Sequence, residues 1–389
     1  MSLFENVPAR FGTRSVKWDL VKSLYGADDV LPMWVADMDF TAPKPVIDAL
    51  TKRVQHGVFG YTFTDPPLHK SIKNWIKKRH DWDISASSLL FSPGVVTTLH
   101  MAVQTFTSPN DSILIQTPVY PPFYDLVKKH DRQLITNSLV LKNNRYEIDF
   151  VDFEEKLKTG VKAFIFCNPH NPVGRVWSKS EVETIANLCM KYNVLILSDE
   201  IHADLIYQGN KHIPIGSLSE KVNAMTITCM SPTKTFNLAG LQVSYAIVPD
   251  QNMREKLSEF SQKQGLTMLN TLGITALDAA YSEGEPWLDE LMTVLQHNRD
   301  LVTEAFKNRN EISIIETEGT YLIWMDCRNM GLIHNDLKMF MQEKAKVGLN
   351  DGISFGDDGN GFMRMNIACP SALVEEGTNR IIQALDNYL

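Results

Sequence analysis

A lysine that follows a buried apolar segment is the residue of this chain best suited to covalent chemistry. Lys234 ends the motif Ser231-Pro232-Thr233-Lys234, which comes directly after the apolar run of residues 224–230. A lysine amine attacks carbonyl groups when burial lowers its pKa, and a rigid strand before it would hold the side chain in place. Ser-x-x-Lys is also a short pattern that recurs by chance, and alone it describes a loop with a solvated charge at least as well. The motif therefore needs support from the rest of the chain.

Two further polar residues follow apolar runs in the same way. Asn171 lies in the loop after one run and Asp199 follows another, and amphipathic helical patterns separate the runs. Apolar strands that alternate with helices predict a mainly parallel sheet covered on both faces, whose ligand site lies beyond the carboxyl ends of the strands. We therefore expect Asn171, Asp199 and Lys234 to converge at one edge of this sheet. The predicted strands are residues 112–116, 161–167, 193–198, 224–230 and 243–248.

A turn of small residues offers a place for an anion. Ser92-Pro93-Gly94-Val95-Val96 leads into a helical pattern over residues 97–104. The free backbone N–H groups at a helix start lie at the positive end of the helix dipole and bind phosphate. The same pattern describes any capped helix, so this signal is weak by itself.

The organisation of the chain changes twice along its length. Residues 1–45 contain four interrupting prolines and predict an irregular N-terminal arm that packs on the small domain. Residues 46–284 hold the alternating strands and helices of a large domain. Residues 285–389 begin with a long helical pattern and continue with short strands, which predicts a smaller α+β domain.

Composition excludes several classes of function. The hydrophobic content of 44% and the formal net charge of −8 indicate a soluble globular protein without a nonspecific grip on nucleic acid or anionic membrane. No apolar stretch is long enough to cross a bilayer, and residues 1–15 lack the apolar run of a signal peptide. The five cysteines form no Cys-x-x-Cys pair and the ten histidines show no ligand spacing, so we expect a cytoplasmic protein with no metal site.

Two hydrolase motifs are present but lack their context. Ser-x-x-Lys with the Lys-Thr-Gly of residues 158–160 is reminiscent of penicillin-recognising serine enzymes, but here the Lys-Thr-Gly comes first and no Ser-Asp-Asn occurs. Residues 352–356 match the nucleophile-elbow pattern, but they lie in an acidic loop and no histidine follows them. Neither motif therefore predicts a hydrolase.

The remaining motifs together resemble one family. Residues 168–174, 198–202 and 231–234 resemble the motifs of fold-type I pyridoxal 5′-phosphate (PLP) enzymes of the class I/II aminotransferase family, and Arg364 matches that family's carboxylate-binding arginine. The resemblance covers nearly the whole chain and implies the α/β fold of that type, with a mainly parallel sheet in the large domain. Three other stretches are closer to one branch, the MalY/PatB-like cystathionine β-lyases. They are residues 10–19, 34–40 and 234–240.

The resemblance implies a role for each matching residue. Lys234 would hold PLP covalently and then act as general base at the substrate Cα, while Asp199 would keep the pyridine nitrogen protonated. Arg364 would bind the α-carboxylate of an amino-acid substrate. The other implied cofactor contacts are the backbone N–H groups of Val95 and Val96, the Ser231 hydroxyl, the side chains of Tyr120, Asn171 and His202, and Tyr61 of the partner subunit in a homodimer.

Two positions depart from the aminotransferase pattern. His202 stands where many of these enzymes have tyrosine, and Gln242 stands where they have a phosphate-binding arginine. Both departures favour the lyase branch. Ordinary packing for Tyr120, a purely structural hydrogen bond for His202 and a simple interface role for Tyr61 remain open alternatives.

The sequence thus predicts a PLP-dependent β-elimination enzyme that cleaves cystathionine or a related cysteine S-conjugate to a thiol, pyruvate and ammonia. An aminotransferase on the same scaffold is the alternative, because both reactions need the same electron sink. A regulatory protein that retains the fold is a third hypothesis. It is disfavoured because Lys234, Asp199, Asn171 and Arg364 are all present.

Overall fold

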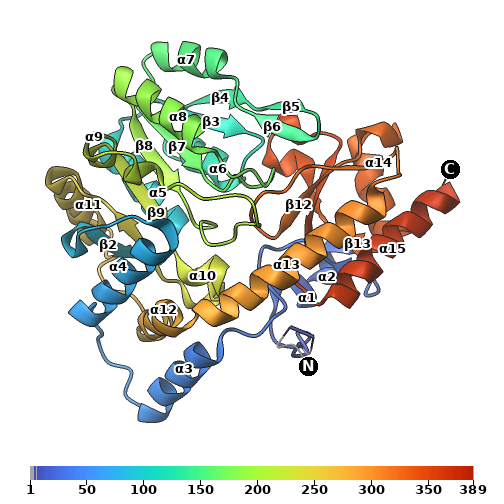
Figure 1. Ribbon diagram of the computed structural model, residues 1–389, viewed down its shortest axis with the longest axis horizontal. Coiled ribbons are helices and arrows are strands. Elements are labelled where there is room, and N and C mark those ends of the chain that lie inside the picture. The colour runs from blue at the N-terminus through green and yellow to red at the C-terminus, as the bar shows by residue number, and fades with distance from the viewer. Residues whose placement is uncertain (1–3, 6, 389) are drawn as a thin grey trace.

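A seven-stranded sheet forms the centre of the larger part of the molecule (Figure 1). The computed structural model describes residues 4, 5 and 7–388. The strand order is β2 (Leu89–Ser92), β10 (Ser244–Ile247), β9 (Thr226–Met230), β8 (Leu195–Asp199), β7 (Ala163–Cys167), β3 (Ser112–Thr117) and β4 (Gln133–Ser138).

The parallel core of the sheet agrees with the prediction from the apolar runs. Strands β9, β8, β7, β3 and β4 are parallel, and all residues of β7 and β9 are buried. In the register of the sheet, Asp199 is paired with Cys167 on one side and with Cys229 on the other. The carboxyl ends of three neighbouring strands therefore meet at one edge, which is where the polar residues were expected.

Strand β10 differs from the expected direction. It runs antiparallel to both β9 and β2. The segment between β9 and β10 holds only the four-residue helix α10 (Pro232–Thr235) and one 3₁₀ turn. A parallel return would require a full crossover connection, usually a longer helix, so the chain reverses direction instead.

Helices cover both faces of the sheet. One face packs against α5 (Val95–Phe106), α6 (Pro122–Lys128) and α11 (Gln251–Lys263). The other packs against α7 (Phe150–Lys158) and α8 (Lys179–Lys191), and a Ser178–Glu181 capping box begins α8. This double cover explains why the strands are continuously apolar.

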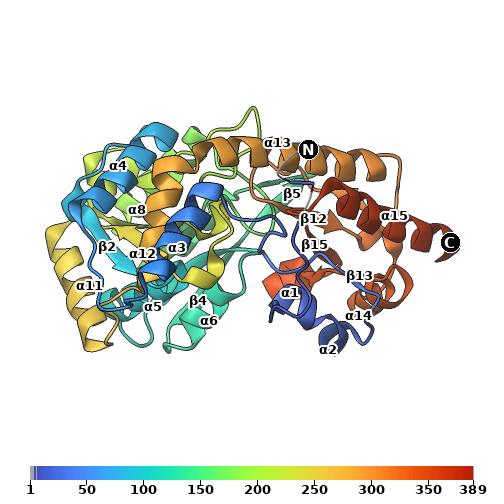
Figure 2. The ribbon, with the colours of Figure 1, turned by 90° about the horizontal axis from the view of Figure 1, so that it is seen from below.

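A second, antiparallel sheet organises the C-terminal part. Its strand order is β11 (Ser313–Ile314), β12 (Leu322–Asp326), β15 (Phe362–Asn366) and β14 (Asn350–Asp351). The long helix α13 (Glu285–Phe306) runs from the larger part along the smaller one, where it packs beside α15 (Ser371–Tyr388) (Figures 1 and 2). A domain boundary between residues 284 and 285 stays a prediction.

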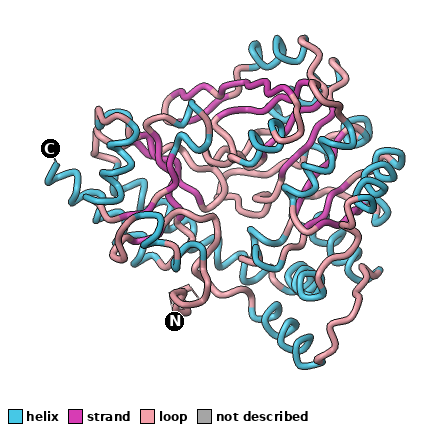
Figure 3. The backbone as a smooth tube through the Cα atoms, turned by 180° about the vertical axis from the view of Figure 1, so that it is seen from behind, coloured by secondary structure: helices cyan, strands magenta, loops and turns pink. Residues whose placement is uncertain are grey.

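The N-terminal arm is more regular than expected. Two short helices, α1 (Val16–Asp19) and α2 (Val21–Tyr25), fit between Pro8 and Pro32, so the prolines flank these helices and do not interrupt them. Strand β1 (Leu31–Pro32) then pairs in parallel with β13 (Val347–Gly348) of the C-terminal part. The tube view in Figure 3 shows the N-terminal segment next to the smaller part of the molecule. The remaining elements are α3 (Lys44–His56), α4 (Pro66–His80), β5 (Val140–Lys142), β6 (Arg145–Glu147), α9 (Glu220–Ala224), α12 (Thr271–Glu283) and α14 (His334–Met339).

Candidate active site

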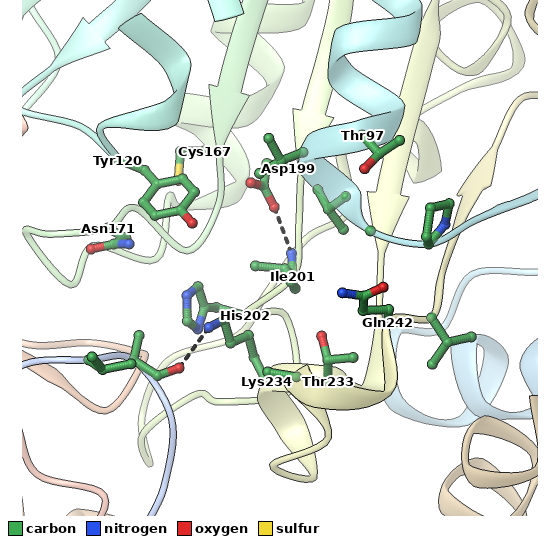
Figure 4. A pocket seen from close by; sticks show the side chains of 18 of the residues that line it. Thr97, Tyr120, Cys167, Asn171, Asp199, Ile201, His202, Thr233, Lys234 and Gln242 are labelled. Atoms are coloured by element: carbon green, nitrogen blue, oxygen red, sulfur yellow. Dashed lines mark hydrogen bonds between the residues drawn. The ribbon is translucent and has the colours of Figure 1, made fainter. Parts of the chain in front are cut away.

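A cavity of about 330 Å³ lies at the carboxyl edge of the parallel strands. It brings together most of the residues that the sequence analysis selected, although they come from distant parts of the chain (Figure 4). The predicted residues that line it are Val95, Val96, Tyr120, Asn171, Asp199, His202, Lys234 and Arg364.

Lys234 extends from the short helix α10 into this cavity. Its Nζ donates a hydrogen bond of 2.6 Å to the backbone oxygen of Ala36. Burial, reinforced by the positive charge of Arg364, lowers the pKa of Lys234 to about 8, although Asp37 and Asp199 oppose the shift. A substantial fraction of this amine is therefore unprotonated near neutral pH, as a nucleophile or base requires.

Asp199 is the last residue of β8 and is only 5% exposed. Its Oδ1 accepts a 3.1 Å hydrogen bond from the Ile201 N–H, while Oδ2 has no hydrogen-bond partner among the described residues. Burial raises the pKa of Asp199 to about 7; the Ile201 bond and Lys234 oppose this effect, and the neighbouring Glu200 carboxylate adds to it. A buried carboxylate with an open oxygen fits a partner that brings a proton, such as a pyridine nitrogen.

Arg364 on β15 is held in the cavity wall by neutral partners. Its Nη1 donates to Asn171 Oδ1 at 2.8 Å, and its Nη2 donates to Asn350 Oδ1 at 2.6 Å and to the Trp34 oxygen at 3.3 Å. Burial lowers the pKa of Arg364 to about 10, and its buried Nε has no hydrogen-bond partner within residues 4, 5 and 7–388. Because none of its described partners is a carboxylate, the guanidinium fits an anionic ligand.

The start of helix α5 forms the opposite end of the cavity. Gly94 is its N-cap and provides no side-chain cap, so the first backbone N–H groups are open to a ligand. Thr97, Thr233 and Gln242 lie at this end, across the cavity from Tyr120 and Asn171 (Figure 4). The sequence analysis missed Thr97 and Thr233 as lining residues. The helix start was a signal for Thr97, and Thr233 lies within the lysine motif itself.

Two predicted cofactor contacts are not brought into the cavity of this chain. Ser231 is the N-cap of α10: its hydroxyl donates to the Val243 oxygen at 2.7 Å and accepts from the Thr233 N–H at 3.1 Å. Its hydroxyl is therefore engaged in holding the turn, and Thr233 lines the cavity in its place. Tyr61 is 95% exposed on the loop between α3 and α4. A role for Tyr61 in a partner subunit stays a prediction.

The remaining two predicted residues flank the centre of the cavity. The Tyr120 ring lies beside Cys167 in Figure 4, and burial raises the pKa of its hydroxyl. Burial, together with Lys234 and Arg364, lowers the pKa of His202 to about 3, so this imidazole is neutral. His202 Nδ1 is buried and has no hydrogen-bond partner in the described part of the chain, which leaves a polar atom available to a ligand.

Residues 34–40, which we call the strap, form a wall of the cavity that connects its two halves. From the lysine side, Asn237 donates to the backbone oxygens of Met38 and Phe40 at 3.0 and 2.8 Å. From the arginine side, Asn366 donates to the backbone oxygens of the strap residues Val35 and Asp37 at 2.5 and 2.7 Å. The strap is thus bonded to residues close in sequence to both Lys234 and Arg364.

A buried ion cluster fixes the strap from outside. Asp39 pairs with Lys17 at 2.8 Å and with Arg10 at 2.7 Å, and it also accepts from Trp18 Nε1 at 2.8 Å. Arg10 also pairs with Asp37 at 2.6 Å. These residues belong to two of the stretches that resemble the lyase branch, and the structure shows them in contact with one another.

Metal-binding clusters and membrane-spanning helices were searched for among the described residues. Over residues 4, 5 and 7–388, no group of three His, Cys, Asp or Glu side chains is arranged to hold a metal ion. In the same part of the chain, no helix is long and apolar enough to cross a membrane.

Known proteins resemble this chain over almost its whole length. Residues 28–381 match the family described as aminotransferase class I and II. The chain is 46% identical over 385 residues to cystathionine β-lyase PatB of Bacillus subtilis (strain 168), covering 98% of this chain and 99% of that protein. Cystalysin from Treponema denticola, whose crystal structure contains PLP, has a TM-score of 0.96 and 37% identity, covering 99% of both chains. The PLP-bound C–S lyase from Staphylococcus hominis has a TM-score of 0.90 and 31% identity, covering 98% of this chain and 97% of that one. The fold predicted from the sequence is thereby confirmed.

Proposed function

We propose that this chain, which belongs to the family of class I and II aminotransferases, is a PLP-dependent C–S β-lyase. It cleaves cystathionine, or a related cysteine S-conjugate, with water to a thiol, pyruvate and ammonia; the thiol from cystathionine is homocysteine. The observation that carries the proposal is the meeting of Lys234, Asp199 and Arg364 in one cavity. The 46% identity to a cystathionine β-lyase over 98% of the chain supports elimination as the reaction.

The residues of the cavity fit PLP at both ends. The open N–H groups at the start of α5, with Thr97 and Thr233, would hold the phosphate. Asp199 would accept a hydrogen bond from the ring nitrogen through its open Oδ2. When bound, PLP supplies a carbonyl group that condenses with amines and a ring that draws electrons from the substrate Cα.

Two side chains and one backbone oxygen then act on the amino-acid substrate or on its proton. Arg364 binds the α-carboxylate, since its guanidinium is buried and lacks an anionic partner among the described residues. Lys234 takes the proton from Cα, because an amine with a pKa of about 8 is an effective base near neutral pH. The oxygen of Ala36 accepts from Lys234 Nζ and so orients the protonated amine.

Incubation of the PLP-loaded protein with cystathionine and no added keto acid tests the proposal. We expect pyruvate and homocysteine in equal amounts, and no pyruvate from a Lys234→Ala variant. A variant of an exposed lysine, Lys44→Ala, is the matched control and should retain full activity. Absence of pyruvate with every cysteine thioether tried would overturn the proposal. Conversion of the cofactor to pyridoxamine phosphate by alanine would instead indicate an aminotransferase.

We further propose a homodimer in which each subunit completes the other's site. Four large side chains within six residues of the loop between α3 and α4 are exposed, which is unusual for a monomer and typical of an interface. They are Val58 (61%), Phe59 (58%), Tyr61 (95%) and Phe63 (78%). Tyr61 matches the family's tyrosine that reaches the partner's phosphate site.

Mixing two inactive variants tests this arrangement. A dimer of one Lys234→Ala chain and one Tyr61→Ala chain has one site with both residues intact if Tyr61 acts in the partner. Random exchange of subunits should then restore about a quarter of the wild-type activity. No recovery, together with a monomeric mass in sedimentation, would contradict the proposal.

The cytoplasm is the compartment that we propose for this enzyme. Its five cysteines are all buried and unpaired, as expected of a protein kept in a reducing environment. Detection of the protein in the soluble cell fraction checks this; recovery from the medium or the periplasm would contradict it.

A further inference from the structure

Two buried carboxylates lie directly behind the cavity. In the turn that follows β8, Asp199, Ile201 and His202 line the cavity. Glu200, which lies between them, and Asp204, two residues after His202, are not part of the lining and are only 1% and 6% exposed. Each of them is hydrogen-bonded to a histidine from another segment, and none of these four side chains has a part in the proposed reaction.

Asp204 connects this turn to the segment that carries the lysine. Its Oδ2 accepts from the Thr235 hydroxyl at 2.9 Å, and Thr235 directly follows Lys234. Trp75 Nε1 donates to both carboxylate oxygens at 3.2 Å, and His80 Nε2 lies 3.1 Å from Oδ1. Burial raises the pKa of Asp204, but the hydrogen bond and charge of His80, the charge of Arg79 and the Thr235 hydrogen bond together lower it below its ordinary value. Asp204 is therefore an anion that accepts hydrogen bonds from Trp75 of helix α4 and from Thr235, the residue after Lys234.

Glu200 makes a corresponding set of bonds behind Asp199. It lies 2.7 Å from His212 Nε2 and accepts from the Ser198 hydroxyl at 2.8 Å and from the Ile215 N–H at 3.2 Å. Burial lowers the pKa of His212, and its Nδ1 accepts no hydrogen bond from any residue that the structure describes. This pattern fits an imidazole whose Nε2 carries the proton and donates it to a Glu200 side-chain oxygen.

The two carboxylate–imidazole pairs touch each other. The rings of His80 and His212 meet edge to face, with centroids 5.4 Å apart. A continuous series of side-chain and backbone contacts thus leads from Asp199 to Lys234 on the side away from the cavity. Its members are Asp199, Glu200, His212, His80, Asp204, Thr235 and Lys234.

We propose that this series is a positioning device that fixes the amine of Lys234 relative to the carboxylate of Asp199, with Asp204 as its central residue. The inference rests on the proposed function, in which both groups act on one bound cofactor. The helix α10 that carries Lys234 has only four residues, so it cannot hold the lysine by itself and needs an external contact. A displacement of about 1 Å between reacting groups can lower a rate by about a hundredfold, so such a contact matters for turnover.

Removal of the Thr235 hydroxyl tests the device at its contact with the segment that carries the lysine. Thr235→Val deletes the bond to Asp204, whereas Thr235→Ser keeps a hydroxyl at the same place. Thr226→Val is the matched control, because Thr226 is also buried (1% exposed), is also a threonine, and donates only to the Val222 oxygen at 2.8 Å, at the start of β9. Each PLP-loaded variant is assayed for kcat and KM with cystathionine, and the visible absorbance of the bound cofactor is titrated with pH.

We expect Thr235→Val to lower kcat by about 10- to 100-fold while KM changes by less than about twofold. We also expect its cofactor absorbance to titrate at a different pH from the wild type. Thr235→Ser should restore both properties, and Thr226→Val should lose only thermal stability. Wild-type values of kcat and of the titration midpoint in Thr235→Val would overturn the proposal.

A second variant and a second readout cover the two ways in which this experiment could fail. If Thr235→Val does not fold, His80→Gln removes the imidazole from the other side of Asp204, and the same changes are expected. If the wild type binds PLP but makes no pyruvate, the proposed function fails, and the absorbance titration still decides whether the contact positions Lys234.

Discussion

The titration of Lys234 gives the most direct test of how the cavity prepares its chemistry. An ordinary lysine has a pKa near 10.5, whereas burial and the charge of Arg364 lower that of Lys234 to about 8. At pH 7 the unprotonated fraction should therefore be about 9%, compared with about 0.03% for the ordinary value, a difference of about 300-fold. The reactivity of the amine at neutral pH should rise accordingly.

Competitive labelling measures this fraction in the protein without cofactor. Trace amounts of a radiolabelled arylating reagent react with unprotonated amines, and the label in each peptide is quantified between pH 6 and 11. Lys44, whose side chain is 81% exposed, provides an internal reference in every sample. We expect the labelling of Lys234 to reach half its plateau near pH 8.

A second variant separates the two causes of the shift. Arg364→Met removes the positive neighbour and leaves the burial, so the midpoint for Lys234 should move to higher pH. Arg254→Met, on helix α11 and absent from the cavity lining, should leave it unchanged. A midpoint above pH 10 in the wild-type protein would refute the argument that burial activates this lysine, and an unchanged midpoint in Arg364→Met would refute the charge effect.

Three other perturbations follow from the structure. Asp39→Ala leaves buried Lys17 without its partner and should lower the free energy of unfolding, measured in urea, by about 3–5 kcal/mol. Asp289→Ala removes an exposed pair with Arg79 and should lower the free energy of unfolding by less than about 1 kcal/mol. An equal loss in the two variants would contradict the importance of the buried cluster. Arg364→Lys loses the bidentate hydrogen bonding of the guanidinium to a carboxylate and should raise KM for cystathionine at least about tenfold, with kcat less affected. An unchanged KM would show that Arg364 does not bind the substrate. Because the pKa of Asp199 rises from 3.8 when unfolded to about 7 when folded, its stabilising contribution is complete below pH 4 and is lost as the pH rises through 7. The unfolding free energy of the cofactor-free protein should therefore fall over this range relative to that of Asp199→Asn, as denaturant titrations at several pH values can measure, and parallel pH curves would show that Asp199 titrates normally.

The convergence of the site could be predicted from the sequence because it depends on a regular feature of the fold. The runs that end near Asn171 and Asp199, and the run before Lys234, become neighbouring parallel strands, so their carboxyl ends necessarily meet. The direction of β10 was missed because apolar strands look alike in a sequence whichever way they run. The engagement of Ser231 with the Val243 oxygen was missed because a hydroxyl at this position can cap the turn as well as bind a phosphate.

Backbone groups account for another part of the site that the sequence could not reveal. The oxygen of Ala36 accepts from Lys234 Nζ across 198 residues, and it also accepts from the Tyr321 hydroxyl at 2.8 Å. Every residue has a backbone oxygen, so no residue type marks this one as functional. Its place is fixed by long-range packing of the strap, which only the folded structure shows.

The stretches that resemble the lyase branch acquire a physical meaning from this packing. Arg10 and Lys17 are absent from the cavity lining, and their charges are engaged with Asp37 and Asp39. What they provide is the position of the strap, whose backbone oxygens contact Lys234 and Arg364. The strap touches both Lys234 and Arg364, the residues proposed to take the Cα proton and to bind the substrate carboxylate. Residues 10–19 and 34–40 therefore contribute to the site by fixing the geometry of the cavity wall, and Arg10 and Lys17 do so from outside the cavity.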